Sequence, residues 1–162
     1  MNKKSGERIL KYNHFHFQYL EQQDIHYELV PHRHTESSMN AAGSAHIPAA
    51  KIAKPVILED ENGYLMAVVP AHHHVKINVV NRILSRKLGL ATEQELRPLF
   101  VDCEEGAIPP VGQAYGIETI IDDCLGECPD LYLEAGDHEG FIHLQASSYR
   151  QLMAQVQHGK IS

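Results

Sequence analysis

Residues 46–58, HIPAAKIAKPVIL, hold the pattern that decides the fold. Pro48 suits the first position of a short helix, because proline fixes φ and lacks the N–H that a helix start leaves unpaired. The residue before a proline avoids the helical region, so Lys54, which precedes Pro55, is expected to be extended. The apolar run 56–58 then predicts a strand. Lys54 is therefore expected at a junction between a short helix and a strand.

The elements on either side of this stretch predict an α+β fold. The apolar runs 56–58 and 64–69 flank Glu61-Asn62-Gly63, in which Asn-Gly is a strong signal for a β-hairpin turn. Other expected strands are half-buried residues 25–29, ended by Pro31, and residues 119–121, 131–134 and 141–144. Because strands and helices do not alternate regularly, the pattern favours a twisted, mostly antiparallel, mixed sheet over a Rossmann fold.

Helices are predicted from apolar spacing and capping residues. An amphipathic pattern covers residues 6–23, and Thr35 suits the N-cap of a short helix. Residues 78–89 form another helix that Gly89 is expected to cap. Thr92 and Glu95 form a capping box for the next. A last helix begins near residue 147 and carries apolar residues as far as 156.

Length and composition fit one cytoplasmic domain, residues 1–162, whose first 24 residues form an N-terminal helix. The chain has 162 residues, of which 43% are hydrophobic, and no run of 18 apolar residues that could span a membrane. The first 15 residues lack the apolar core of a secretion signal. Cys103, Cys124 and Cys128 are odd in number and form no CxxC pair, so we expect neither a disulfide framework nor a structural zinc site. Acidic neighbours would raise the pKa of the Cys103 thiol and disfavour it as a nucleophile.

Charge is unevenly distributed along the chain. Residues 93–139 carry one basic and 13 acidic residues, a net charge of −12, whereas the whole chain carries −7. A nucleic acid would therefore bind only a local basic face in the first half, and DNA is not an expected partner. The basic residues of that half that could form such a face are Lys3, Lys4, Arg8, Lys11, Arg82, Arg86 and Lys87, although ordinary solvated charges explain each of them as well.

Common catalytic motifs are absent from the sequence. It contains no GxSxG, GxGxxG or P-loop motif. The tract His72-His73-His74 suggests metal binding, but consecutive side chains point in different directions on any regular element. We therefore expect no functional metal and no cofactor, and interpret the tract as a surface loop.

Lys54 and the loop 106–112, GAIPPVG, are the candidate site. The apolar neighbours of Lys54 make a partly buried ammonium plausible, and such a group needs an anionic or carbonyl partner. In the loop, glycines let backbone approach a ligand and prolines fix φ, so its N–H groups could hold a developing oxyanion. The alternatives are a solvated lysine and a plain connecting turn.

Five segments in order resemble a known family: HRHTESSMNAA, KIAKPVIL, YLMAVVPAHHHV, CEEGAIPPVGQAYGI and LYLEAGDHEGFIHL. From about residue 25 to 153 the chain is similar to the YbaK-like family, the prolyl-tRNA synthetase-associated editing domains. Its free-standing, single-domain members with an AGDHE segment are the most similar. The resemblance implies a sheet curled towards a barrel with helices around it. It implies an aminoacyl-tRNA deacylase that hydrolyses the ester of a mischarged amino acid and edits in trans.

The resemblance also implies which residues form the site. Lys54 corresponds to the key lysine, and Gly106 and Pro110 to the ends of the GxxxP loop. Lys54 would contact the terminal phosphate or the carbonyl region, and the loop would polarise the ester. Substrate contacts are expected from Thr35, Ala107, Ile108, Gly112, Gly136, Asp137 and His138, with His32 as a further candidate.

Several alternatives stay open. The base could be a ribose hydroxyl acting through water, or His138 could assist, or Asp137 and His138 could only shape a turn. Pro55 and Pro109 stand where the family more often has threonine and a small hydroxyl residue, which would alter the amino acid removed. The acidic stretch 93–139 should face away from the tRNA. The expected partner is the 3′ end of aminoacyl-tRNA, with a cognate aminoacyl-tRNA synthetase as a further one; the alternative function is a non-catalytic tRNA- or amino-acid-binding module.

Overall fold

The structure, a computed structural model, describes residues 15–32, 43, 46–104 and 106–162. The start of the predicted N-terminal helix and the short helix expected to open at Thr35 lie outside these residues. None of the described helices is long and apolar enough to cross a bilayer.

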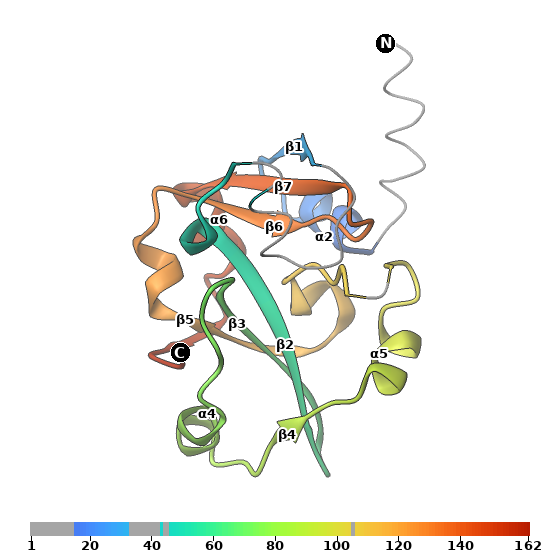
Figure 1. Ribbon diagram of the computed structural model, residues 1–162, viewed down its shortest axis with the longest axis vertical. Helices are drawn as coiled ribbons and strands as arrows, with labels where there is room; N and C mark the ends of the chain where they lie inside the picture. Colours follow the sequence, from blue (N-terminus) through green and yellow to red (C-terminus); the bar gives the residue numbers. More distant parts are fainter. Residues whose placement is uncertain (1–14, 33–42, 44–45, 105) are drawn as a thin grey trace.

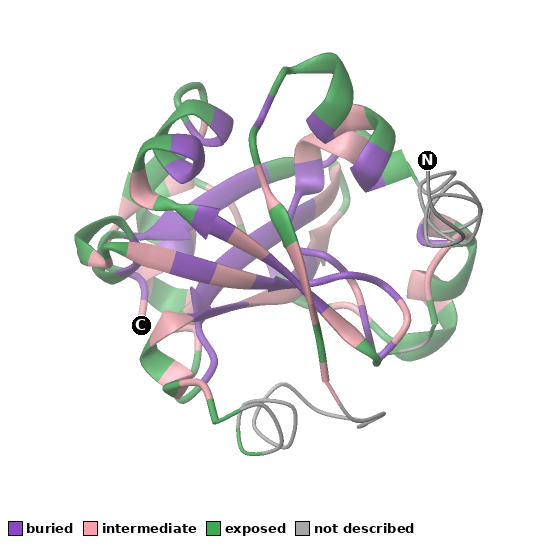
Figure 2. Cartoon of the chain, turned by 90° about the horizontal axis from the view of Figure 1, so that it is seen from above, coloured by how far each residue is buried: buried purple, intermediate pink, exposed green. Residues whose placement is uncertain are grey.

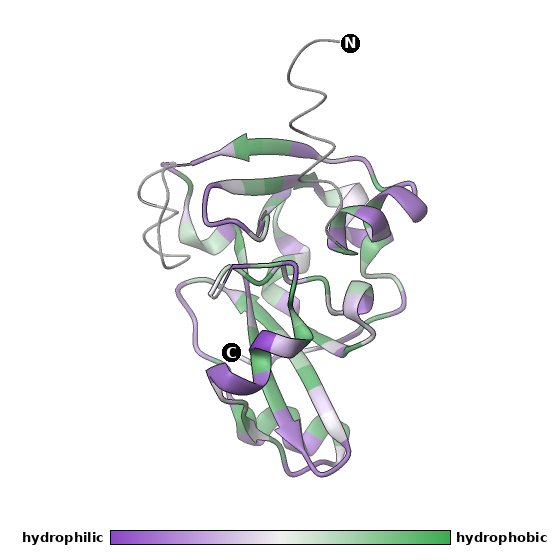
Figure 3. Ribbon diagram, turned by 90° about the vertical axis from the view of Figure 1, so that its right-hand side faces the viewer, coloured by the Kyte–Doolittle hydropathy of each residue, from purple (hydrophilic) through white to green (hydrophobic). Residues whose placement is uncertain are grey.

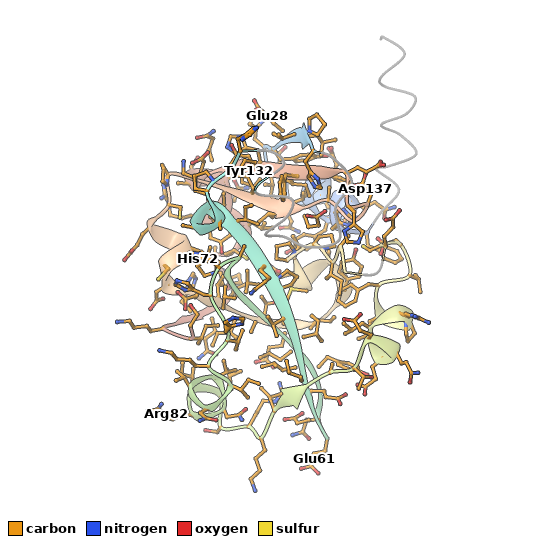
Figure 4. All side chains as sticks on the ribbon, in the orientation of Figure 1. Glu28, Glu61, His72, Arg82, Tyr132 and Asp137 are labelled. Atoms are coloured by element: carbon orange, nitrogen blue, oxygen red, sulfur yellow. The ribbon has the colours of Figure 1, made fainter. Side chains whose placement is uncertain are left out.

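The predicted hairpin is confirmed and forms the centre of the fold. It consists of β2 (Ile52–Asp60) and β3 (Gly63–Pro70), which pair antiparallel along their length. The two-residue turn Glu61-Asn62 joins them, and the Asn62 N–H donates to Asp60 Oδ1 at 2.8 Å. Figure 4 shows Glu61 at the tip of this hairpin, at the bottom of the molecule.

The strands join into one mixed sheet. The others are β1 (Glu28–Pro31), β4 (Gly89–Leu90), β5 (Glu118–Asp122), β6 (Asp130–Glu134), β7 (Gly140–Gln145) and β8 (Gln157–Gly159). The eight strands of the described chain follow the order β1-β7-β6-β2-β3-β5-β8, with β4 paired to β2. The path does not close into a barrel.

The predicted α+β fold with a mixed sheet is thus confirmed, with more parallel pairing than expected. The pairs β2–β6, β3–β5 and β5–β8 are parallel, whereas β1–β7, β2–β3, β2–β4 and β6–β7 are antiparallel. In Figure 1, β2 descends steeply from the layer of β1, β7 and β6 at the top to the hairpin tip.

Helices and short 3₁₀ turns surround the sheet. They are α2 (Phe15–Gln22), η1 (Ala49–Lys51), α4 (Ile77–Leu84), α5 (Glu93–Leu99), η2 (Gly112–Tyr115), η3 (Asp123–Glu127) and α6 (Ala146–Leu152). The short helix expected at Pro48 is η1, which begins one residue later. The capping box of α5 is confirmed, because the Thr92 side chain accepts from the Glu95 N–H and donates to Glu95 Oε1.

Some predicted boundaries were wrong. Helix α4 ends at Ser85, which adopts the left-handed conformation with φ 54°, and Gly89 instead begins β4. The first strand starts at residue 28 rather than 25, because the Ile25 N–H still donates to Leu20 O in the turn that leaves α2. Helix α6 ends at Leu152, before Val156.

The core lies on both faces of the central hairpin. Side chains alternate along a strand, so Ile57, Met66 and Val68 join one buried cluster and Leu58 and Leu65 join another. Figure 2 shows the buried residues concentrated on the central strands, and Figure 3 shows hydrophobic segments along these strands. The sheet therefore provides a rigid support for groups at its edges.

Candidate functional site

Strand β2 leaves the middle of one edge without a strand partner in the described chain. Ile52 and Ala53 pair with β6, and Leu58 and Glu59 pair with β4. Strand β3 occupies the opposite edge throughout. The backbone of residues 54–56 therefore faces a gap between β6 and β4.

A cleft of about 440 Å³ opens at this gap. Four segments distant in sequence surround it: strand β2, the β4–α5 region, the loop at 106–108, and the end of β6. The residues that line it are Lys54, Pro55, Val56, Ile57, Leu90, Ala91, Glu93, Leu96, Gly106, Ile108 and Glu134.

Lys54 is extended, as predicted from Pro55, and lies at the wall of this cleft. Its Nζ donates to the backbone carbonyl oxygen of His73 at 2.6 Å, which fixes the ammonium group. Partial burial lowers the pKa of Lys54, because the charged form loses hydration. The side chain is therefore a positioned cation with incomplete solvation, which favours an anionic or carbonyl ligand.

The loop at 106–112 meets Lys54 in the cleft through two residues, Gly106 and Ile108. Gly106 has φ +81°, a conformation that favours glycine. The N–H groups of Ala107 and Val111 donate to Glu104 O and Pro109 O inside the loop. These two N–H groups are already hydrogen-bonded. The loop N–H groups that remain to bind a ligand in the cleft are those of Gly106 and Ile108.

The other residues of the loop support it from beneath. Ala107, Pro110 and Gly112 are buried and do not line the cleft. A Cβ on Gly112 would collide with Thr119 Oγ1 and lie 2.9 Å from Ile117 O, so only glycine fits there. Pro109 is also buried, whereas Pro55 lines the cleft.

The AGDHE segment forms a turn after β6 and contacts the loop. The Glu104 N–H donates to Gly136 O at 2.8 Å, which ties the turn to the chain just before Gly106. Asp137 Oδ1 accepts from the Glu139 N–H at 2.9 Å, so Asp137 shapes the turn. His138 is buried with φ 59°. In Figure 4, Asp137 lies at one end of the upper strands, away from Tyr132 in the middle of β6.

The predicted residues thus fall into two groups, those that line the cleft and those that do not. Lys54, Gly106 and Ile108 lie in the cleft, and the remaining described ones (Ala107, Pro110, Gly112, Gly136, Asp137 and His138) are not among its lining residues. Thr35 lies outside the described residues. His32 is close to the cleft, with its Nε2 3.5 Å from Glu134 Oε1.

Glu134 is the cleft residue that the sequence did not reveal. Its side chain is 8% exposed, and burial, with a contribution from the charge of Asp137, raises its pKa to about 8. In sequence it is one polar residue in an alternating strand, LYLE, which normally indicates a solvated face. Only the end of the β2–β6 pairing brings it into the cleft.

The acidic stretch 93–139, which was expected to face away from the tRNA, contributes two acidic residues to the cleft. Glu93 and Glu134 from that stretch line the cleft beside Lys54. The reason is topological: α5 and the end of β6 both flank the open edge of β2.

A second hollow of about 320 Å³ adjoins the cleft. The two share Glu93, Leu96, Gly106 and Ile108, and the second extends to Phe100 and Cys103. Together they offer more space than a single amino-acid side chain requires.

Cys103 belongs to a hydrogen-bonded cluster rather than to a nucleophile pair. Its Sγ lies 3.2 Å from the Tyr115 hydroxyl, which donates to Asp102 and lies 3.0 Å from His16 Nδ1. Burial raises the pKa of the Cys103 thiol to about 12, and the Asp102 charge adds to this. In the described part of the chain, only His16, Asp102 and Cys103 are grouped closely enough to hold a metal, and the tract at 72–74 is not.

Sequence comparisons match most of the chain to one family profile. The profile of a family described as "Aminoacyl-tRNA editing domain" matches residues 32–152. A comparison with curated proteins found no match.

Solved structures share the fold at low sequence identity. A candidate trans-editing enzyme for prolyl-tRNA synthetase superposes with a TM-score of 0.79 at 20% identity, over 91% of this chain and 94% of the other. A scaffold protein used for computational epitope grafting gives 0.80 at 18% identity, over 91% and 95%. A candidate signal transduction protein from Marinobacter aquaeolei VT8 gives 0.73 at 19%, over 91% of this chain and 30% of the other.

Proposed function

The chain belongs to the aminoacyl-tRNA editing domain family, and from this premise we propose that it is a deacylase that hydrolyses the ester of a mischarged amino acid from tRNA. The observation that carries the proposal is the convergence of Lys54 with Gly106 and Ile108 in one cleft. A fixed cation and backbone donors are what an ester with an adjacent phosphate requires.

The chemistry asks little of the protein beyond binding and polarisation. An aminoacyl ester is already activated, so a water can attack it without a covalent enzyme intermediate. Lys54, held by the His73 carbonyl, would contact the terminal phosphate or the ester carbonyl. The N–H groups of Gly106 and Ile108 would bind the negative charge that develops on the carbonyl oxygen. The base would be a ribose hydroxyl of the substrate acting through the water.

Deacylation of a panel of mischarged tRNAs tests this function. Purified protein is incubated with tRNAs charged with alanine, serine or cysteine among others, and the release of amino acid is measured. We expect release well above the rate in buffer for at least one of them. No release above buffer from any tRNA would refute the deacylase, and tight binding without turnover would establish the non-catalytic module instead.

Replacing Lys54 tests the site. We expect Lys54→Ala to lower kcat/KM by about 10²- to 10³-fold, the range seen when one group that stabilises the oxyanion is removed. Lys160→Ala, which removes the same charge from an exposed position outside the cleft, is the matched control and should keep the wild-type rate. A wild-type rate in Lys54→Ala would remove this lysine from the mechanism.

A further inference from the structure

The cleft holds an ammonium and a carboxyl group that do not pair with each other. Lys54 and Glu134 both line it, and the Lys54 ammonium donates to the His73 carbonyl. An ammonium and a carboxyl group that line one cavity without pairing are suited to a ligand that carries both a negative and a positive group.

The register of the sheet explains why both residues line the same cleft. In the parallel β2–β6 pair, Ile52 is opposite Tyr132 and Ala53 is opposite Leu133. The next position along each strand is Lys54 on β2 and Glu134 on β6. Paired positions in a sheet point to the same face, and the pairing ends here. The two side chains therefore flank the point where the strands separate.

Glu134 is buried, and one of its carboxyl oxygens has no hydrogen-bond donor in the described structure. Its side chain is 92% buried, and its Oε1 atom accepts no hydrogen bond within the described structure. The titratable groups recorded near it are His32, whose Nε2 is 3.5 Å from Oε1, and Asp137, whose charge opposes ionisation. A buried carboxyl oxygen without a donor costs free energy, so a cationic ligand group would be bound strongly.

An aminoacyl-tRNA end has such a group. Its ester carries a free α-amino group on the acyl side, and the nearest anionic group is the phosphate of the terminal nucleotide. If Lys54 binds the phosphate or the ester carbonyl, the amino group is the cationic group that remains for Glu134.

We propose that Glu134 binds the α-ammonium group of the aminoacyl ester, so that the cleft selects free aminoacyl esters and rejects N-acylated and peptidyl esters. This inference rests on the proposed deacylase function and names the substrate class of the same cleft. Glu134 is a substrate-recognition residue with no part in activating the water.

The test compares each aminoacyl-tRNA with its N-acetylated form. With the amino acid that the panel shows to be removed fastest, we expect wild-type kcat/KM to be about ten- to a hundredfold higher for the free amine, the range of a charge-assisted hydrogen bond. Glu134→Gln should bring this ratio close to one. Glu127→Gln, which removes a carboxylate from an exposed position outside the cleft, should keep the wild-type ratio.

Two outcomes would overturn the assignment. A wild-type ratio near one would show that the amine is not recognised. A ratio that stays high in folded Glu134→Gln, while both rates fall together, would show that Glu134 activates water or only supports the fold. If Glu134→Gln does not fold, Glu134→Met, which also removes the carboxylate, replaces it, and an unchanged ratio in that variant would equally count against the proposal.

A binding measurement separates this inference from the deacylase function. The probes are 3′-deoxy-3′-(alanylamido)adenosine, whose amide resists hydrolysis, and its N-acetyl derivative. Tighter binding of the free amine that is lost in Glu134→Gln would support recognition by Glu134 even in a protein without turnover. Equal binding of the two probes, or no binding of either, would reject it.

Discussion

Lys54 and Glu134 show how a sheet edge can set two side chains in unusual environments. Each lies on a largely buried strand, one position beyond the last β2–β6 pair. Desolvation favours the neutral form of both groups, lowering the pKa of Lys54 and raising that of Glu134. Perturbed groups in a cleft are typical of functional sites, because burial that costs stability is retained where it serves a ligand.

The raised pKa of Glu134 predicts a pH-dependent cost in stability. The folded pKa is about 8 against the ordinary glutamate value of 4.5, so the folded state binds the proton more tightly. Stability is fully present below the unfolded pKa and falls as pH rises towards 8. Glu134→Gln cannot ionise, so its free energy of unfolding should exceed that of wild type by an amount that grows from pH 5 to 8.5, up to a few kcal/mol.

Urea unfolding of both proteins at the two pH values measures this difference. Glu127→Gln, at an exposed position, should differ from wild type in its free energy of unfolding by the same amount at both pH values. A constant difference between Glu134→Gln and wild type would mean that Glu134 ionises normally in the folded protein.

Strand β2 combines structural and functional roles at the element scale. The Ala71 N–H, one residue past the end of β3, donates to Ile52 O, so the hydrogen-bonded pairs of the β2–β3 ladder follow in steps of two from Ile52 and Ala71. Such pairs alternate along an antiparallel ladder, so positions 54 and 56 bond to β3 and position 55 points to the open edge. Proline has no N–H to donate, and Pro55 stands where none is needed.

This alternation predicts opposite effects at neighbouring positions of β2. Pro55→Ala should change the free energy of unfolding by no more than about 1 kcal/mol, because no ladder bond is gained or lost. Val56→Pro should destabilise by at least about 1–3 kcal/mol, because it leaves the buried Ala67 carbonyl without a donor. Denaturant midpoints of the two variants measure the contrast, and equal losses would show that the open edge is misplaced.

Arg86 joins distant parts of the whole molecule. Its guanidinium forms a two-pronged pair with Asp60 at 2.6 and 2.7 Å and also contacts Glu118 at the start of β5. This pairing connects the chain after α4 to the hairpin turn and to β5. Arg86 is therefore engaged in the fold.

Arg86 also predicts how the protein responds to acid. Its hydrogen bonds lower the pKa of Asp60 from 3.8 to about 2. A depressed carboxyl pKa contributes stability above the unfolded value that is lost as pH falls through the folded one. Arg86→Met should therefore be less stable than wild type at pH 6, and the difference should shrink as pH falls from 4 towards 2.

Urea midpoints over this pH range measure the effect of Arg86. Arg82→Met, at an exposed position of α4, is the control and should match wild type throughout. A difference between Arg86→Met and wild type that is constant from pH 6 to pH 2 would contradict the role of the pair with Asp60.

Local chemistry determined much of what the sequence could predict. The extended Lys54, the hairpin at Asn62-Gly63 and the Thr92 capping box depend on neighbours within a few residues, and all three are confirmed. The α+β class followed from the order of these elements. The association of Lys54 with the loop at 106–112 came from the family resemblance, since spacing alone does not bring distant segments together.

Only the tertiary structure decided the shape of the site. The pairings of β2 with β6 and with β4, which create the gap at residues 54–56, join positions at least 30 residues apart, and no local preference encodes their register. For the same reason Glu134 could not be distinguished from a solvated strand residue. The sequence by itself determined the strand that carries Lys54, and long-range pairing decided what faces it, because side-chain burial depends on where the partner strand ends.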